Sequence, residues 1–312
     1  MSKKLILRLS NELGNQMFMY ASAYSIAKEL NRKLYIDDET AFLSKKNVSK
    51  FRLNFFNISS EIANEEQKYK NFSGYIKRKF LIKSDFLRNK KKFYIEKKNK
   101  DKIAKYSDIY KSLSFDDNLF VEGHFESEKY FSKYKNELFN EFKFKNLNIL
   151  KKNNYIKDVN NKNSVSICLR QNRYFEGGGQ NTQFNREKSW NFTLEQINYI
   201  NKSVEYIKSK VSNPTFFLWS NDFSNISKTQ FSFTYKEVRL SEDDNIYKPV
   251  KSLFILSQCN HFIVTTSTFN WWGAWLSKDN SKIILRPSKK FFSNFYLNNL
   301  DFWPSNWNKV DP

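Results

Sequence analysis

The sequence predicts an α/β protein with two parallel-sheet domains that face a cleft. Short runs of β-branched and aromatic residues alternate with longer segments whose apolar residues recur at helical spacing, and such alternation is typical of parallel sheets covered by helices. A polar run at 151–163, rich in Asn and Lys, separates two series of this kind. With 312 residues, 40% of them hydrophobic, the chain is large enough for two cores. We therefore expect an N-terminal domain over residues 1–155 and a C-terminal domain over residues 156–312.

The first half begins with a strand, a helix and a second strand, which together form a βαβ unit. The strands are expected at 4–9 and 33–36, and the helix between them carries apolar side chains at helical spacing, namely Met17, Ala21, Tyr24, Ala27 and Leu30. The Lys-rich middle, residues 67–111, is expected to be helical and irregular. A strand at 118–121 and a helix at 127–142 are expected to complete this domain.

The second half alternates more regularly. Strands are expected at 164–170, 215–220, 236–240, 261–265 and 282–286. Thr193 followed by Gln196 has the pattern of a capping box, so a helix is expected to begin there. Further helices are expected at 246–257, with Pro249 in the first turn, and at 269–276. Ligands of such sheets bind beyond the carboxyl ends of the strands, so the residues that follow each strand are the candidates for a site.

The charge of the chain is concentrated in one segment. The formal net charge is +21, and residues 67–111 hold 16 basic and four acidic residues, a net charge of +12. Lysines are interleaved there with Phe, Leu, Ile and Tyr, as on a basic amphipathic helix. The segment is either a solvated surface, a patch attracted to anionic lipid headgroups, or a nucleic-acid surface. Because Lys outnumbers Arg and no nucleic-acid motif accompanies it, a membrane surface is favoured over nucleic acid.

Several features bound the class of protein. No apolar run approaches the ~20 residues that span a bilayer, and the N-terminus has no secretory signal, so we expect a cytoplasmic protein that contacts the inner face of the membrane peripherally. Cys168 and Cys259 stand in unrelated contexts and are expected to be buried, reduced thiols. The acidic cluster EDD at 242–244 suits the N-terminus of the helix at 246–257 better than a metal site. Neither a metal nor a cofactor is expected.

The run TTSTFNWWGAWLS at 265–277 joins a cluster of hydroxyl side chains to three tryptophans. A strand is expected to end at Thr265, so Ser267 or Thr268 is placed to cap the following helix, whose N–H groups and positive dipole end favour a phosphate. The side of this helix that presses into the core would carry Trp271, Trp275 and Leu276. The alternative is an ordinary N-cap in front of a core helix.

Three further strand ends carry groups suited to a nucleotide. An arginine at the end of a strand can bind phosphate oxygens and neutralise the charge that builds on a leaving group. The candidate nucleotide-binding residues are Gly14, Asn15, Gln16, Arg170, Arg173, Ser220, Asn221, Asp222, Ser267, Thr268 and Phe269. Taken singly, each has a structural explanation, such as a surface salt bridge for an arginine or an Asx cap after a strand. Four such strand ends in one protein favour a nucleotide site.

Five segments resemble the motifs of a known family. These are LGNQMFMYASA (13–23), VEGHFESEKYF (121–131), CLRQNRY (168–174), WSNDF (219–223) and SLFILSQCNHFIVTTSTFNWWGAWL (252–276). They are similar, in the same order, to motifs of the α-1,2-fucosyltransferases of glycosyltransferase family 11. The resemblance runs over most of the chain and implies a GT-B-like fold of two Rossmann-type domains, with the acceptor mostly on the first and GDP-fucose mostly on the second.

One motif departs from the family pattern. Where the family has His-x-Arg-Arg-Gly-Asp, this chain has Cys168, Leu169, Arg170, Gln171, Asn172 and Arg173. Arg170, the position that the family uses against the β-phosphate of the donor, is retained. Arg173 replaces the acid and reverses a charge, which leaves the donor and the acceptor type open. The Gly-rich loop at 174–190 is interpreted as a mobile cover over the site, with a plain disordered loop as the alternative.

The resemblance implies an inverting transfer of L-fucose from GDP-β-L-fucose to a hydroxyl of a galactoside-type acceptor, in an α-1,2 linkage and without a metal. Arg170 is then the catalytic residue, since it would stabilise the charge on the departing β-phosphate together with the backbone at 267–269 and at 14–16. The general base stays open among His124, Glu126, Glu12 and Asp37, with a water-assisted route as a further alternative.

The expected partners are a nucleotide-sugar donor and an oligosaccharide or lipid-linked glycan of a bacterial surface polymer such as O-antigen or lipopolysaccharide. The segment 67–111 is expected to help the protein reach an anionic membrane surface, and no nucleic acid is expected as a partner. Two rival functions stay open at this point. One is a transferase that uses another nucleotide sugar, and the other is a non-catalytic protein that binds an anionic polymer.

Overall fold

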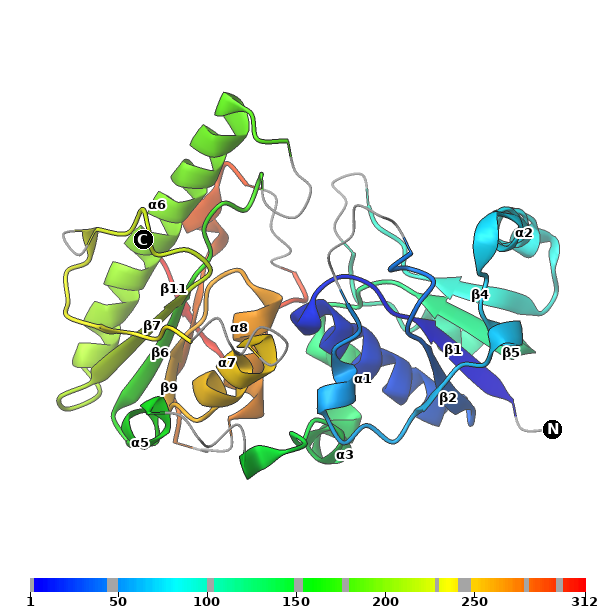
Figure 1. Cartoon of the computed structure of the whole chain (residues 1–312), viewed down its shortest axis with the longest axis horizontal. Helices are drawn as coiled ribbons and strands as arrows, with labels where there is room; N and C mark the ends of the chain where they lie inside the picture. Colours follow the sequence, from blue (N-terminus) through cyan, green and yellow to red (C-terminus); the bar gives the residue numbers. More distant parts are fainter. Residues whose placement is uncertain are drawn as a thin grey trace. The chain divides into compact units, whose positions relative to one another are not determined.

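The computed structural model describes residues 3–43, 50–99, 104–148, 154–175, 180–227, 230–240, 248–277, 281–295 and 300–312 (Figure 1). The chain divides into two compact units. Unit 1 comprises Met1–Lys145 and Leu300–Phe302, and unit 2 comprises Asn146–Asn299 and Trp303–Pro312. Part of the run expected as a linker forms the short helix α5 (Tyr155–Val159), whose Val159 side chain is buried. This part of the run therefore packs as an element of unit 2.

In its described part, unit 1 contains a parallel sheet with the strand order β3-β2-β1-β5-β4. The strands are β1 (Lys4–Arg8), β2 (Lys33–Asp37), β3 (Glu61–Ile62), β4 (Lys91–Ile95) and β5 (Phe115–Glu122). The central strand β1 buries Leu5, Ile6 and Leu7 completely, as expected for a strand covered on both faces. Chain order reverses at β1, so the carboxyl ends of β1 and β5 form the switch point of this sheet.

In the residues that the structure describes, the helices of unit 1 are α1 (Leu13–Glu29), α2 (Asn71–Ser84) and α3 (Lys135–Glu141), together with short 3-10 turns. The expected βαβ unit is confirmed, since α1 connects β1 to its parallel neighbour β2. The helix expected at 127–142 is wrong in its first half. There the chain forms two 3-10 turns, Glu128–Tyr130 and Ser132–Tyr134, before α3 begins.

The Lys-rich middle was expected to be helical and irregular, and strand β4 corrects that expectation. Phe93 and Tyr94 of β4 are buried, and the ring of Phe93 stacks on that of Phe120 in β5 with 5.3 Å between centroids. Strand β4 pairs in parallel with β5, the next strand of the chain. Local spacing in a run rich in lysine cannot reveal such a pairing, because tertiary packing decides it.

Unit 2 contains a second parallel sheet, with the described strands in the order β11-β10-β9-β6-β7-β8. These are β6 (Ser164–Leu169), β7 (Thr215–Ser220), β8 (Lys236–Glu237), β9 (His261–Ile263), β10 (Ile284–Pro287) and β11 (Asn308–Val310). Counted along the chain, this is the 3-2-1-4-5-6 order of dinucleotide-binding sheets. The two Rossmann-type parallel sheets that the sequence predicts are therefore confirmed, with β11 as a strand that the sequence did not reveal.

The helices of unit 2 are α5, α6 (Gln183–Lys208), α7 (Lys248–Ser257) and α8 (Thr268–Leu276) in the described part of the chain. The capping box predicted at Thr193 is wrong, because α6 begins ten residues earlier and Thr182 caps it by accepting a hydrogen bond from the N–H of Asn185 at 3.2 Å. Residues 183–190, expected in a loop, are the first turns of this helix. Residues 176–179 and the acidic cluster at 242–244 lie outside the described residues.

Helix α8 carries the three tryptophans of the run at 265–277, and all of them lie in the core of unit 2. Trp271, Trp272 and Trp275 are all buried, and the rings of Trp271 and Trp272 lie edge to face with 4.9 Å between centroids. A Cβ built on Gly273 would lie 1.9 Å from Cδ2 of Leu256 in α7. Glycine therefore lets α7 and α8 approach closely, and α8 is buried on more sides than the expected single face.

Both cysteines are free and buried, as expected. Burial raises the pKa of the Cys168 and Cys259 thiols, because the thiolate would lose its hydration. Neither thiol is therefore set up as a nucleophile. Among the described residues, no helix is long and apolar enough to cross a bilayer.

Candidate functional site

The carboxyl ends of β6 and β9 lie side by side at the switch point of the unit 2 sheet. Their register pairs Ile167 with Ile263. Beyond this pairing, the Thr265 hydroxyl donates to the carbonyl of Cys168 at 2.8 Å, and Arg173 Nη1 donates to the carbonyl of Thr266 at 3.0 Å. The arginine segment and the hydroxyl cluster, almost a hundred residues apart in the sequence, are thus joined at one sheet edge.

Arg170 directly follows β6 and is exposed at this edge of the sheet. The backbone of Arg170 is held by Gln196 of α6, whose side chain is fully buried. Gln196 Nε2 donates to the carbonyl of Arg170 at 2.8 Å, and the N–H of Arg170 donates to Gln196 Oε1 at 3.3 Å. One amide thus fixes both backbone groups of the residue that carries the guanidinium.

The loops after β6 and β7 are cross-linked by side-chain amides. Asn221 accepts from the N–H of Gln171 at 2.8 Å and donates to the carbonyl of Gln171 at 3.2 Å. Asn172 donates to the carboxylate of Asp222 at 3.1 Å, and hydrogen bonds from Ser224 lower the pKa of that carboxyl group. Gln171 and Asn172, two of the departures from the family motif, therefore join the two loops.

The remaining candidates of β7 and β6 also make contacts within unit 2. The Ser220 hydroxyl donates to the carbonyl of Asp222 at 2.6 Å, which tightens the turn after β7. The guanidinium of Arg173 lies over the ring of Phe192, 4.9 Å from its centroid. Arg173, which replaces an acid of the family motif, thus packs on α6 and binds the loop after β9.

The N-terminus of α8 lies in the same place. Ser267 occupies the N-cap position, and its side chain makes no capping hydrogen bond. Thr266 Oγ1 is buried and has no hydrogen-bond partner among the described residues, a state that costs free energy unless a ligand or water satisfies it. Ser267, Thr268 and Phe269 are half-buried. At this helix terminus, the Thr266 hydroxyl is therefore the group that the described residues leave without a partner.

At the edge of the unit 1 sheet, Gly14, Asn15 and Gln16 lie in the first turn of α1. The buried side chain of Gln16 donates to the carbonyls of Asn11 and Lys50, each at 2.7 Å, and accepts from the N–H of Arg52 at 2.9 Å. The amide of Gln16 thus holds surrounding backbone in place. The hydrogen bond from Gln16 to the carbonyl of Asn11 helps to hold the loop after β1.

The switch point of unit 1 brings together residues from the ends of β1 and β5. Asn11 Nδ2 lies 2.7 Å from His124 Nε2, and His124 Nδ1 lies 3.5 Å from a carboxylate oxygen of Glu126. Both candidates for the base are half-buried. With the proton on Nδ1, the ring would face the carboxylate with its N–H and accept from Asn11 with Nε2.

Behind this pair lies Glu96, which follows β4. Its carboxylate accepts from the N–H groups of His124 and Phe125 at 2.8 and 2.9 Å. Burial raises the pKa of Glu96, because the charged form loses hydration. A Cβ on Gly123, which has a φ of 151°, would lie 2.3 Å from Cβ of Glu96. Gly123 and Glu96 thus fix the loop that carries His124.

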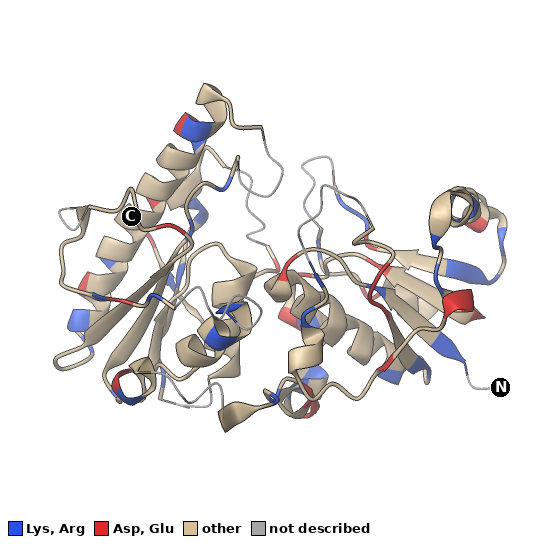
Figure 2. Ribbon diagram, in the orientation of Figure 1, with Lys and Arg blue, Asp and Glu red and all other residues tan. Residues whose placement is uncertain are grey.

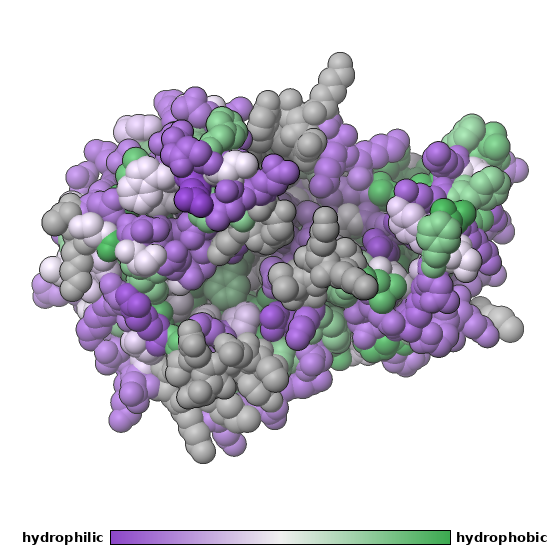
Figure 3. Space-filling view, turned by 45° about the horizontal axis from the view of Figure 1, so that its top comes forward, coloured by the Kyte–Doolittle hydropathy of each residue, from purple (hydrophilic) through white to green (hydrophobic). Residues whose placement is uncertain are grey.

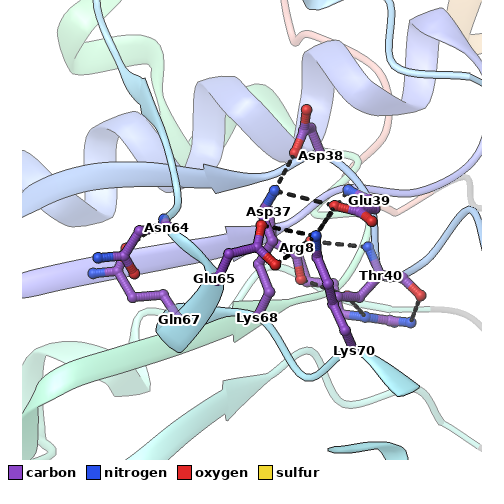
Figure 4. Close-up of polar contacts among 10 residues, drawn as sticks. All are labelled: Arg8, Asp37, Asp38, Glu39, Thr40, Asn64, Glu65, Gln67, Lys68 and Lys70. Atoms are coloured by element: carbon purple, nitrogen blue, oxygen red, sulfur yellow. Dashed lines mark hydrogen bonds and ion pairs between the residues drawn. The ribbon is translucent and has the colours of Figure 1, made fainter. Parts of the chain in front are cut away.

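A network of charges surrounds the ends of β1 and β2 (Figure 4). Arg8 Nε donates to the Thr40 hydroxyl at 2.9 Å, and the Asp37 carboxylate accepts from the N–H of Thr40 at 2.9 Å and from its hydroxyl. Asp37 is therefore occupied in a turn, and Glu12 lies 3.8 Å from Arg52 in an ion pair. Of the four candidates for the base, only His124 and Glu126 contact each other.

No group of three or more His, Cys, Asp or Glu residues within the described ranges could hold a metal ion. The network around Arg8 is balanced instead by basic side chains. Lys68 lies 2.8 Å from Asp38, and Lys70 lies 2.8 Å from Glu65. The described polar groups at the two sheet edges are therefore suited to hydrogen bonding and charge neutralisation.

The family model that describes glycosyl transferase family 11 matches residues 2–311. The chain belongs to glycosyltransferase family 11. Among the curated members that it resembles, an α-1,2-colitosyltransferase from Escherichia coli is 27% identical over 98% of this chain and 99% of its own length. The O-antigen biosynthesis glycosyltransferase WbnK, also from Escherichia coli, is 26% identical over 92% of this chain and 94% of its own length.

A solved structure with a similar arrangement of elements is the fucosyltransferase NodZ from Bradyrhizobium, with a TM-score of 0.48 and 12% sequence identity over 88% of this chain and 92% of that chain. Family 11 membership agrees with the resemblance that the five motifs carry. The protein is thus a glycosyltransferase.

Four residues at the two sheet edges were not predicted from the sequence as parts of a site. They are Asn11, Glu96, Gln196 and Thr266.

Proposed function

We propose that this family 11 glycosyltransferase binds a GDP-sugar at the carboxyl edge of the unit 2 sheet and a glycan acceptor at the carboxyl edge of the unit 1 sheet. The observation that carries the proposal is the junction of the loops after β6 and β9, made by the bonds from Thr265 to Cys168 and from Arg173 to Thr266. It brings an exposed arginine, Arg170, and a helix N-terminus to the switch point where nucleotides bind in such sheets.

In the proposed reaction, the acceptor hydroxyl attacks C1 of the sugar from the face opposite the nucleotide. The new C1–O bond forms as the bond from C1 to the β-phosphate oxygen breaks, and GDP leaves with that electron pair, so the β-linked donor gives an α-linked product. Arg170 and the backbone N–H groups at the start of α8 would stabilise the charge on the departing phosphate. An arrangement of this kind needs no metal ion.

The acceptor proton requires a destination, and the His124–Glu126 pair is the proposed one. The two side chains lie 3.5 Å apart at the switch point of unit 1, beside Asn11. The proton would go to His124 Nε2, from which the acceptor hydroxyl would displace the Asn11 amide that lies 2.7 Å away, while Glu126 lies on the side of Nδ1. Asp37 is less suited to this role, since three hydrogen bonds from Thr40 and Glu39 hold its carboxylate.

The proposed donor is GDP-β-L-fucose and the proposed product an α-1,2-linked fucosyl galactoside, in the synthesis of a bacterial surface glycan. A colitose donor is the second candidate, favoured by the likeness to an α-1,2-colitosyltransferase over nearly all of both chains. Colitose is fucose without one hydroxyl. Arg173 packs against Phe192 of α6 and binds the loop after β9. The family has an acid at this position, and the change of charge would alter which sugar is selected.

The proposed setting is the cytoplasm, with a lipid-linked glycan as acceptor and contact between the segment 67–111 and an anionic membrane surface. The net charge of +12 in this segment supports that contact. The attraction would concentrate the protein on the surface that carries its acceptor.

The test is to incubate the purified protein with β-galactosides and each of GDP-fucose, GDP-colitose, GDP-mannose and UDP-galactose. Mass spectrometry then detects products, and NMR assigns the new linkage. The proposal expects an α-1,2-linked product with one of the two 6-deoxy sugars. Release of neither product nor GDP, across a broad acceptor panel and with full-length folded protein, would overturn it.

A further inference from the structure

Helix α2 leaves a row of large apolar side chains in solvent. Phe72, Ile76 and Phe80, spaced four residues apart on one side of the helix, have 80, 48 and 70% of their surface exposed. The 3-10 turn that follows, Asp85–Leu87, adds Phe86 and Leu87, with 75 and 74% exposed. We call these five side chains the α2 apolar face. Figure 3 shows hydrophobic surface on the part of unit 1 where α2 lies.

The exposure of this face is not a by-product of a poorly attached helix. The opposite side of α2 is anchored, because Leu81 and Ile82 pack against the cluster of Ile6, Ala63, Phe93 and Phe120. On that same side, Arg78 Nε donates to the Glu122 carboxylate of β5 at 2.8 Å. The helix thus has one side fixed to the sheet and a second side that carries exposed apolar side chains.

The charged residues within α2 itself are all basic, and acidic residues lie in the elements around it (Figure 2). Lys77, Lys79 and Lys83 are exposed on α2, and none of them forms an ion pair with an acidic group in the described part of the chain. The one acid of this stretch, Asp85, is buried and accepts from the N–H groups of Lys92 and Phe93. Its charge is therefore turned inward, and the outer surface is positive.

This combination fits one occupant. Lysine is depleted at protein–protein interfaces relative to the rest of the surface, whereas exposed phenylalanines interleaved with lysines are typical of helices that lie in the headgroup layer of an anionic bilayer. Lysine stems can extend along the acyl boundary while their ammonium groups reach the phosphates. The Lys79 ammonium already lies over the ring of Tyr75, 4.5 Å from its centroid.

We propose that the α2 apolar face inserts into the surface layer of an anionic lipid bilayer, with Phe72, Ile76, Phe80, Phe86 and Leu87 below the phosphates and Lys77, Lys79 and Lys83 at their level. This inference rests on the proposed function, in which the acceptor is carried by a lipid. It goes beyond electrostatic attraction of the basic segment, because it requires side chains to leave water.

The experiment measures flotation of the full-length protein with vesicles of phosphatidylcholine and phosphatidylglycerol in equal parts, at low and high salt, without donor or acceptor. Phe72→Ser/Phe80→Ser is expected to lower the vesicle partition constant on the order of tenfold for each phenylalanine removed. Lys77→Gln/Lys79→Gln/Lys83→Gln is expected to lower it on the order of fivefold per lysine at low salt. Insertion predicts that wild-type binding falls at high salt and does not vanish.

The matched control is Phe184→Ser, which removes a phenylalanine 69% exposed on helix α6 of unit 2. It is expected to leave the partition constant unchanged. Insertion is also expected to move a fluorophore attached through Phe80→Cys into an apolar environment, with a blue shift on vesicle addition. The label reaches that site alone because Cys168 and Cys259 are buried.

Three results would overturn the inference. Wild-type protein that does not float, or whose binding disappears entirely at high salt, would show that nothing inserts. Equal partition of wild type and Phe72→Ser/Phe80→Ser would show that the face is not used. Self-association that this double variant abolishes, without any vesicle binding, would make the face an interface between copies of the chain.

Transfer to a water-soluble galactoside keeps this inference separate from the proposed function. Phe72→Ser/Phe80→Ser is expected to transfer sugar to that acceptor at the wild-type rate. If the wild-type protein transfers sugar and does not bind vesicles, the proposed function stands and the membrane inference fails. If it binds vesicles and transfers no sugar, the membrane inference stands and the proposed function fails.

Discussion

The buried side-chain amide of Gln196 binds the backbone of Arg170 on both sides, donating to its carbonyl at 2.8 Å and accepting from its N–H at 3.3 Å. Because the arginine stands at the end of β6 while the glutamine lies on α6, the helix fixes the position from which the guanidinium extends. The geometry assigns Gln196 the part of a positioning residue for Arg170.

Replacing Gln196 by Met keeps the side-chain volume and leaves both backbone groups of Arg170 without their partner. We expect a loss of about 1–3 kcal/mol in the free energy of unfolding, since buried groups would go unpaired. We also expect a fall in kcat of about tenfold in the folded variant. Gln183→Met, the same change on an exposed turn of α6, is the control. A variant that loses stability and keeps its full kcat would show that Gln196 has a structural role alone.

His124 and Glu126 are expected to act together on the acceptor. His124→Ala should lower kcat for transfer by about 100-fold, as typical for the loss of a general base, with little change in the KM for the donor. Glu126→Gln should have a smaller effect of the same kind. The measurement is steady-state kinetics with a soluble galactoside, with Glu61→Gln, an exposed acid on β3, as the control. Equal kcat in all of these proteins would remove the pair from the mechanism.

The close packing of α7 against α8 depends on Gly273. Gly273→Ala should destabilise unit 2 by about 1–3 kcal/mol, because its Cβ would lie 1.9 Å from Cδ2 of Leu256. Leu256→Ala removes that contact at the cost of a cavity. In urea unfolding, the double variant should therefore be more stable than the sum of the two single losses predicts. Simple additivity would mean that the two side chains do not meet.

The stability of unit 1 should depend on the protonation of Glu96. Burial raises the pKa of this carboxyl group above its ordinary value of 4.5. Its contribution to stability is therefore fully present below 4.5 and is lost as the pH rises through the folded-state value. Glu96→Gln, which cannot ionise, should gain stability relative to wild type as the pH rises from 4.5 towards neutral. A difference in unfolding free energy that runs the other way would refute this assignment.

Most of the fold could be predicted because a buried parallel strand is recognisable from the apolar residues of its own short segment. Strands β1, β6 and β7 each contain a run of buried residues, and a polar residue ends or directly follows each strand, a pattern that can be recognised in the sequence. Strand β11 spans only three residues, and β4 lies in a lysine-rich run. Each pairs with the neighbouring strand of the chain, β4 with β5 and β11 with β10, and this pairing is a tertiary effect that no local pattern contains.

Candidate site residues that directly follow a strand could be predicted from the sequence. Residues that take part only through a contact between distant segments could not. Arg170 and Ser267 could be named because each comes at or shortly after the end of an apolar run. The part played by Gln196 could not, because a glutamine near Thr193 has the pattern of a helix start, and only the true start of α6 at Gln183 places it mid-helix. A polar side chain within the apolar side of a helix was the signal available.

The central claim is that Arg170 stabilises the departing GDP. The most direct test compares wild type, Arg170→Lys and Arg170→Ala for GDP release from the donor in the presence of acceptor, with the affinity for GDP and the unfolding temperature measured alongside. Arg170→Ala is expected to lower kcat by about 100- to 1,000-fold, Arg170→Lys is expected to recover part of this loss, and both variants are expected to stay folded. A folded Arg170→Ala variant that releases GDP at the wild-type rate would contradict the claim.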